Sequence, residues 1–210
     1  MTDFQPIRLV PHLAVLLACL LSGACSTAGL AVSGAAGAGV MAAQERGFQG
    51  GLQDTRIRMD INHLWLQEDE VLFRNVNLQV QEGRVLLSGK VEQPEMRVTA
   101  ARLAWQVEGV QAVINEITVT DKSSLTSAAR DSWIATELKT KLLFDREIDA
   151  INYSVETVNQ VVYLIGLAQN EAELQRVIAH AKDIAYVRQV VSHVILKDDP
   201  RRHTIAAPPN

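Results

Sequence analysis

Hydrophobic and polar positions along the chain follow one pattern twice. Residues 54–120 and 131–197 align at a constant offset of 77 without a gap. Almost all matched positions are apolar or glycine, so the repeated part is a core, whereas the surface has diverged. Matched pairs include Ile57/Ile134, Ile61/Leu138, Trp65/Leu142, Leu78/Val155, Leu87/Leu164, Gly89/Gly166, Ala104/Ala181 and Ile117/Val194. The sequence therefore predicts a duplicated domain.

Within each repeat, the pattern predicts the order helix, strand, strand, helix, strand. Helical spacing over 54–67, with Asp54 as a possible N-cap, is followed by two alternating stretches around a tight turn at Glu82-Gly83. A second helix then ends at Gly109. The second repeat predicts a helix over 129–144, strands over 152–158 and 161–168, a helix over 170–185 and a strand over 189–197. Each repeat is expected to be α+β, a three-stranded sheet with both helices on one face.

Two glycines, Gly89 and Gly166, lie inside predicted second strands, where glycine costs stability. We expect a structural reason, the close approach of a neighbouring backbone or helix. The domains should span residues 52–121 and 129–198. Each is close to the lower size limit for an independent core, so the two lobes are expected to lean on each other.

The N-terminal region reads as a leader followed by a spacer. The apolar run 13–21 is too short for a span of ~20 residues but has the length of a signal-peptide core. Small residues 22–24 precede Cys25, which resembles a bacterial lipobox with residues 1–24 as signal peptide and Cys25 as the acylated anchor. An ordinary secretory signal, or a buried helix with a chance cysteine, remains the alternative.

Composition predicts two further segments without a fold of their own. Residues 25–51 are rich in glycine, alanine and serine, which favours a flexible tether, although such residues also let helices pack closely in lipid. Residues 199–210 are charged and then rich in proline, so we expect a disordered tail.

The αββαβ unit, with a glycine in its second strand (LLSGKV and YLIGLA) and the ending V-x-x-V, resembles the BON domain. Tandem BON domains behind a lipobox are similar to lipoproteins of the Gram-negative outer membrane that are associated with cell division and envelope stress. The most specific stretch is DSWIATELKTKLL, residues 131–143. The resemblance implies a non-enzymatic module, anchored by lipid at the periplasmic face of the outer membrane. It would bind anionic phospholipid through the second domain and support envelope integrity.

The first helix of the second repeat has two apolar sides. Ile134, Leu138 and Leu142 form the stripe that should face the core. A Trp suits a membrane interface, and a Lys can reach phosphates from an apolar surface. The opposite side carries Trp133, Thr136, Lys139, Thr140, Leu143 and Phe144. These residues are the predicted lipid-binding site.

The first repeat lacks this surface, because Trp133, Leu143 and Phe144 correspond to Arg56, Leu66 and Gln67. Two alternatives remain for the large side chains. Trp133 and Phe144 can pack against the first lobe or residues 121–130, or they can bind a protein partner. The functional alternative is accordingly a periplasmic protein-interaction or osmotic-stress module that works with outer-membrane assembly or cell-wall proteins.

Composition and motifs argue against other classes of function. A net charge of −4 and 5% aromatic residues disfavour nucleic-acid binding. Both cysteines, Cys19 and Cys25, precede the repeats, which therefore hold neither a disulfide nor a cysteine metal site. The five histidines lack metal-ligand spacing, and topology alone brings His180 towards His193. Because nucleophile-elbow and phosphate-loop motifs are also missing, we expect no enzyme, no metal and no cofactor.

Overall fold

The computed structural model describes residues 39–41, 43–120 and 125–205. Residues Met41–Asn210 form one compact unit, which contains both repeats. The predicted signal peptide and Cys25 lie outside the described residues, as does the tether up to residue 38. The repeats form two α+β domains, as the hydrophobic pattern predicts.

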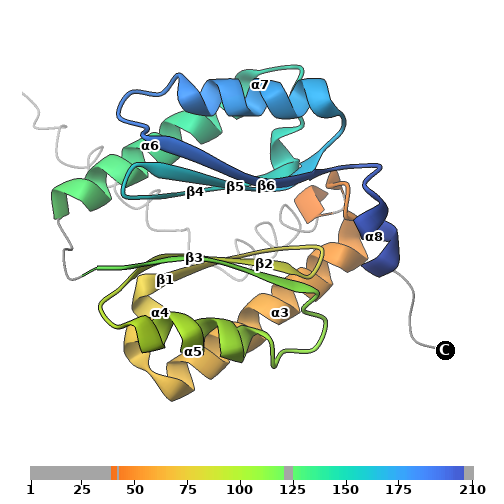
Figure 1. The fold of residues 1–210 in the computed structure, drawn as a ribbon. Coiled ribbons are helices and arrows are strands. Elements are labelled where there is room, and N and C mark those ends of the chain that lie inside the picture. Colours follow the sequence, from red (N-terminus) through yellow and green to blue (C-terminus); the bar gives the residue numbers. More distant parts are fainter. Residues whose placement is uncertain (1–38, 42, 121–124, 206–210) are drawn as a thin grey trace, which may run out of the picture. The chain divides into compact units, whose positions relative to one another are not determined.

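The first domain contains α3 (Gly47–Glu68), α4 (Glu70–Asn75), β1 (Val76–Gln81), β2 (Arg84–Val91), α5 (Pro94–Ala104) and β3 (Ala112–Val119). The second contains α6 (Leu125–Phe144), the 3-10 helix η2 (Ala150–Asn152), β4 (Tyr153–Val158), β5 (Val161–Ala168), α7 (Glu171–Lys182) and β6 (Gln189–Leu196), and is followed by α8 (Pro200–Ile205). In each sheet the middle strand pairs antiparallel with the strand before it and parallel with the strand after it. Helices cover one face of each sheet (Figure 1).

Several boundaries differ from those that the sequence predicts: α6 begins at Leu125 and not at 129, α7 ends at Lys182 and not at 185, and α5 ends at Ala104, before Gly109. Three larger differences concern whole segments. Helix α3 begins at Gly47, so residues 47–51 are helical, not part of a tether, and Asp54 is not its N-cap. A short helix, α4, follows because the Asp69 carboxylate caps it by accepting the Val71 N–H at 2.7 Å. The predicted disordered tail is wrong over Pro200–Ile205, which forms α8.

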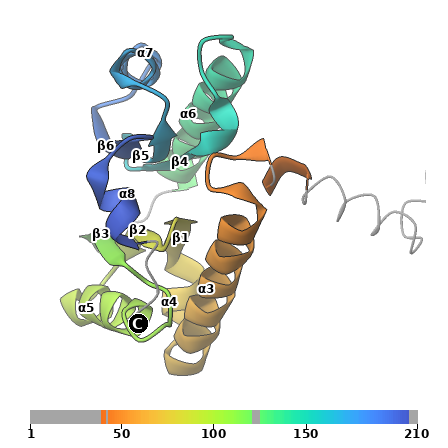
Figure 2. The same ribbon diagram turned by 90° about the vertical axis from the view of Figure 1, so that its right-hand side faces the viewer.

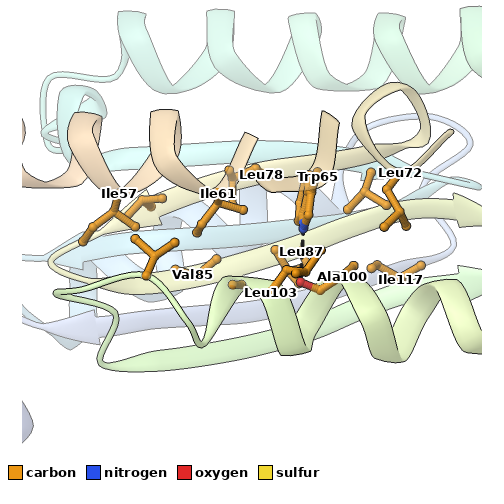
Figure 3. Packing of buried hydrophobic residues seen from close by; sticks show 14 of the residues in the cluster. Ile57, Ile61, Trp65, Leu72, Leu78, Val85, Leu87, Ala100, Leu103 and Ile117 are labelled. Carbon is orange, nitrogen blue, oxygen red and sulfur yellow. Dashed lines mark hydrogen bonds between the residues drawn. The ribbon is translucent and has the colours of Figure 1, made fainter. Parts of the chain in front are cut away.

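The core of each domain lies between its sheet and its helices. Ile57, Ile61 and Trp65 are buried on α3 at the predicted helical spacing. The Trp65 indole N–H donates to the Ala100 carbonyl at 3.2 Å, so that α3 is joined to α5 inside the core (Figure 3). In the second domain, the same positions hold Ile134, Leu138 and Leu142, which are likewise buried.

A buried carboxylate holds the hairpin of each domain. Asp131 accepts the N–H groups of Asn159 and Gln160, both at 2.8 Å. Both turn residues have positive φ, 52° and 66°, as a two-residue hairpin of type I′ requires. Asp54 accepts the N–H groups of the corresponding turn residues, Glu82 and Gly83, both at 2.9 Å. The repeated aspartate therefore fixes a strained turn, a role that the sequence pattern did not predict.

Gly89 and Gly166 are where the first strand of each domain comes closest to the second. A Cβ atom on Gly166 would lie 2.2 Å from the Asn152 carbonyl oxygen, and one on Gly89 would lie 2.2 Å from the Asn75 oxygen. Gly89 also has φ +128°, a conformation that favours glycine. The predicted reason, close approach of a neighbouring backbone, is confirmed at both positions.

The two domains share a third cluster of buried residues, formed by the sheet faces that no helix covers. Leu86 of β2 packs there with Val158, Tyr163 and Ile165 of the second domain. β5 is consequently buried along almost its whole length, because alternate side chains enter two different cores. Polar pairs join the domains around this cluster, including Gln79 with Glu156 at 2.5 Å and His193 with Glu116 at 2.9 Å. As expected from their size, the lobes lean on each other.

The segment before the first domain contacts the second domain, and the helix after the second domain contacts the first. Before α3, the side chain of Gln44 donates to the Ile151 carbonyl at 2.6 Å, and the Glu45 N–H donates to the Asn152 side chain at 2.9 Å. After β6, Arg202 of α8 forms two hydrogen bonds with Glu82 in the first-domain hairpin, at 2.7 and 2.9 Å. Figure 2 shows α8 between the two sheets' ends, beside β2. We call these two sets of contacts the terminal clasp.

Candidate lipid-binding surface

Helix α6 places large apolar side chains on both of its sides. Its inner stripe is at most 2% exposed, whereas Trp133 is 45% exposed, Leu143 67% and Phe144 78%. The alternative of interdomain packing is therefore wrong for Phe144, whose side chain lies mostly outside the fold. Trp133 contacts an aromatic ring of its own domain instead, that of Tyr186, with 6.0 Å between ring centroids and an interplanar angle of 73°.

The three polar residues of the predicted site lie on the same exposed side. The hydroxyls of Thr136 and Thr140 donate to the carbonyls four residues earlier, both at 2.8 Å, so their oxygens remain available as acceptors. Lys139 is exposed. At 1.5 Å per residue, the stretch from Trp133 to Phe144 is roughly 16 Å long. The structure thus brings all six predicted residues to one side of a single helix.

Several charged residues in and next to α6 are engaged in contacts, so the charge that the helix exposes differs from a simple count along the sequence. Asp131 is turned into the hairpin and is only 7% exposed. Asp145 is held by Arg176 and His180, and Lys141 pairs with Asp183 at 2.9 Å. In the described part of the chain, no carboxylate lies within ion-pair distance of Arg130 or Lys139. Glu137, four residues after Trp133, lies half-buried on the same side, so Arg130 and Lys139 leave the outer side of this helix with an excess of one positive charge.

Two residues of this surface were missed by the sequence analysis. The guanidinium carbon of Arg130 lies 5.0 Å from the centroid of the Tyr186 ring, and this ring in turn meets Trp133. Tyr186 belongs to the connection between α7 and β6, far from α6 in sequence. The repeat did contain a signal, because the offset of 77 places Tyr186 opposite Gly109, an exchange of the smallest residue for an aromatic one.

A charged cluster follows the end of α6. The Asp145 carboxylate contacts His180 Nε2 at 2.7 Å and accepts from Arg176 Nε at 2.8 Å. The hydrogen bond with His180, followed by one from the Glu147 backbone and the contact with Arg176, lowers the pKa of Asp145 to about 2. His193, in contrast, bonds Glu116 of the first domain. The two histidines that topology allowed to meet thus bind different carboxylates.

The Asp145 contacts predict a measurable change of pKa. We expect its carboxyl carbon to titrate near pH 2 in an NMR experiment, and His180→Ala to move the midpoint towards the ordinary value of 3.8. Because the pKa is lower in the folded state, the cluster stabilises the fold above about pH 4, and this stabilisation is lost as the pH falls through 2. A wild-type midpoint of 3.8 would contradict the described hydrogen bonds.

Two other features, a metal-binding cluster and a membrane-crossing helix, are absent from the described residues. Within them, no group of three histidine, cysteine, aspartate or glutamate side chains is placed to hold a metal ion. Nor does any described helix combine the length and the apolar character that crossing a membrane requires.

The corresponding surface of the first domain is different in chemistry. Arg56, which corresponds to Trp133, lies 3.7 Å from Asp60 and 3.8 Å from Glu108. Gln67 is exposed in the place of Phe144, Leu66 is 51% exposed in the place of Leu143, and Met59 is 66% exposed in the place of Thr136. The two aromatic residues, Trp133 and Phe144, are therefore specific to the second domain, as the sequence predicts.

Comparison with known proteins identifies the family to which the two domains belong. The family model described as "BON domain" matches residues 53–121 and 130–198. An uncharacterized protein in the gshII 5′ region of Anaplasma centrale is 40% identical over 72% of this chain and 99% of its own length. The outer membrane lipoprotein DolP of Haemophilus influenzae is 38% identical over 55% of this chain and 60% of its own length. The osmotically-inducible protein Y of Escherichia coli is 28% identical, over 66% and 70% of the two chains. This chain belongs to the BON-domain family, with one BON domain in each of its repeats.

Proposed function

We propose that this protein is a non-enzymatic lipoprotein of the outer membrane that contacts anionic phospholipid through α6 of its second BON domain. The observation that carries the proposal is the exposure of Leu143 and Phe144, 67% and 78%, at the end of this helix. Adjacent apolar side chains exposed to this extent mark an interaction surface. Trp133, with an apolar ring and a polar N–H, suits the boundary between headgroups and acyl chains.

The path of the chain before α3 supports the same orientation. Gln44 and Glu45 bond Ile151 and Asn152, which follow Phe144 by only seven and eight residues. The chain therefore enters the folded unit beside η2, which contacts α6. An anchor raises the effective concentration of this surface at the bilayer, so a weak second contact suffices.

The experiment is co-sedimentation of residues 41–210, which lack the anchor, with vesicles of phosphatidylglycerol and phosphatidylcholine. Trp133→Ala combined with Leu143→Ala should weaken binding at least about tenfold. Burying one such side chain is worth about 1.5–3 kcal/mol, and ~1.4 kcal/mol is a factor of ten. The matched control is Leu66→Ala, at the corresponding exposed position of the first domain, which should leave binding unchanged.

Either of two results would contradict this proposal. Equal binding by the double variant would remove α6 as the lipid-binding site. An absence of sedimentation by the wild-type unit would leave the acyl group as the membrane contact and favour the alternative, a module that binds outer-membrane assembly or cell-wall proteins.

Acylation of Cys25 is the second part of the proposal. The name of the Haemophilus relative, an outer membrane lipoprotein, supports it. Mass spectrometry of the mature protein from a Gram-negative host should show an N-terminus at Cys25 carrying acyl chains. An unmodified cysteine would instead favour a stress-related periplasmic role, for which the osmotically-inducible relative is the precedent.

A further inference from the structure

The connection between α7 and β6 contains a residue in a backbone conformation that its side chain disfavours. Tyr186 has φ +69°, and Gly109, its counterpart in the first domain, has φ +90°. Both domains thus use a positive φ at this position, which glycine adopts without steric cost. A bulky residue there is strained, and such strain is concentrated at binding sites.

Burial in a core does not offset this strain. Tyr186 is 61% exposed, and its ring contacts are Trp133, 45% exposed, and Arg130. The tyrosine therefore joins the connection to the outer side of α6 without filling a cavity. What it holds in place is a guanidinium group and an indole ring on the proposed lipid-binding surface.

We propose that Arg130, Trp133 and Tyr186 form a clamp for the phosphate of an anionic phospholipid headgroup, an inference that rests on the proposed function. Guanidinium groups bind phosphate oxygens through paired N–H donors, and a ring face orients such a group by cation–π attraction. Arg130 is available for this role, because in the described residues no carboxylate is within ion-pair distance of it. The indole N–H and the phenol O–H are further donors suited to the interface.

The clamp and the apolar pair Leu143 and Phe144 lie at different places along α6 and should have different roles in binding. Arg130 and Trp133 lie ten or more residues before Leu143 and Phe144, so one part of the surface carries donors and the other carries apolar side chains. Headgroup preference should depend on the clamp, and depth of insertion on Leu143 and Phe144. Substitutions at the two places should consequently change different properties of binding.

The test measures vesicle binding and thermal unfolding of residues 41–210 for Tyr186→Gly. Binding to phosphatidylglycerol vesicles should fall about threefold or more, because the cation–π contact that orients Arg130 is lost. The unfolding midpoint should not fall, because glycine relieves the strain that the first domain avoids. A midpoint lower by several degrees would mean that Tyr186 is a packing residue and would overturn the proposal, as would unchanged binding.

Two further variants test the charge and the shape of the Arg130 side chain. Arg130→Gln should reduce the preference for phosphatidylglycerol over phosphatidylcholine, and Arg130→Lys should restore it only in part, because lysine binds phosphate as a point charge. Trp105→Ala is the control, since Trp105 is a 54% exposed aromatic residue of the first domain. An unchanged lipid preference in Arg130→Gln would overturn the clamp.

The outcomes distinguish this inference from the proposed function. If the wild-type unit binds and the Trp133/Leu143 double variant does not, while Tyr186→Gly binds normally, only the clamp is refuted. If the wild-type unit does not bind vesicles of either composition, the proposed function fails first. Competition by soluble sn-glycerol 3-phosphate that is lost in Arg130→Gln would support the clamp, because it would show that the guanidinium group recognises the phosphate.

Discussion

Replacing Gly166 with alanine is expected to lower the free energy of unfolding by about 3 kcal/mol, the upper part of the usual range for overpacking. The added methyl group would lie 2.2 Å from the Asn152 carbonyl oxygen and 3.0 Å from the Tyr153 Cα. Both atoms belong to the backbone, so a rotamer change cannot relieve the clash. β4 must move away from β5, to which Tyr153 is paired at Gly166.

Chemical denaturation of residues 41–210 measures this loss directly. Gly50→Ala is the control, because the added atom would meet only the side chain of Arg46, at 3.3 Å, and alanine favours a helix. It should leave stability unchanged or slightly raised. A loss of less than 1 kcal/mol for Gly166→Ala would show that β4 shifts freely, and would remove the packing explanation for the repeated glycine.

Asp131→Ala should cost a similar amount, about 3 kcal/mol, because two backbone N–H groups lose a charged acceptor. These groups belong to Asn159 and Gln160, whose positive φ angles are themselves unfavourable for residues with side chains. Asp131 also lies 4.0 Å from Lys90 of the first domain. Its loss should therefore loosen both the hairpin and the polar rim between the domains.

Two variants separate these contributions to the Asp131→Ala effect in denaturation experiments. Asp131→Asn retains an acceptor oxygen and should lose less stability than alanine. Gln160→Gly introduces the residue type that the first domain has at this turn position, Gly83, and should recover part of the loss in the Asp131→Ala background. Equal stability of wild type and Asp131→Ala would contradict the role assigned to this carboxylate.

The hydrophobic pattern predicted the fold well because burial in this protein follows local periodicity. The strands over 152–158 and 161–168 are observed within one residue of their predicted bounds, since side chains alternate between faces. α4 was missed because its six residues are too few for a helical period to show. α8 was missed for a different reason, because Arg202 is held by Glu82, 120 residues earlier.

The sequence could predict only those residues of the candidate surface that lie on a single helix, α6. The spacing on α6 identified Trp133, Leu143 and Phe144 as outward residues, since their positions follow from those of the core stripe. Tyr186 reaches this surface from another element, and a helical period cannot indicate that. The repeat shows that Tyr186 corresponds to Gly109. The sequence does not show that both residues have a positive φ, and without this the exchange does not indicate strain at Tyr186.

The terminal clasp also determines where mechanical load enters the protein. A pull on the N-terminal end meets the bonds from Gln44 and Glu45 to Ile151 and Asn152 before it reaches α3. Glu45 is additionally paired with Lys197 at 3.2 Å, at the end of the last strand. Force applied through a tether would thus be carried first by the second domain, although the first domain comes next in the sequence. The order of the domains along the chain and their order along the line of tension are opposite.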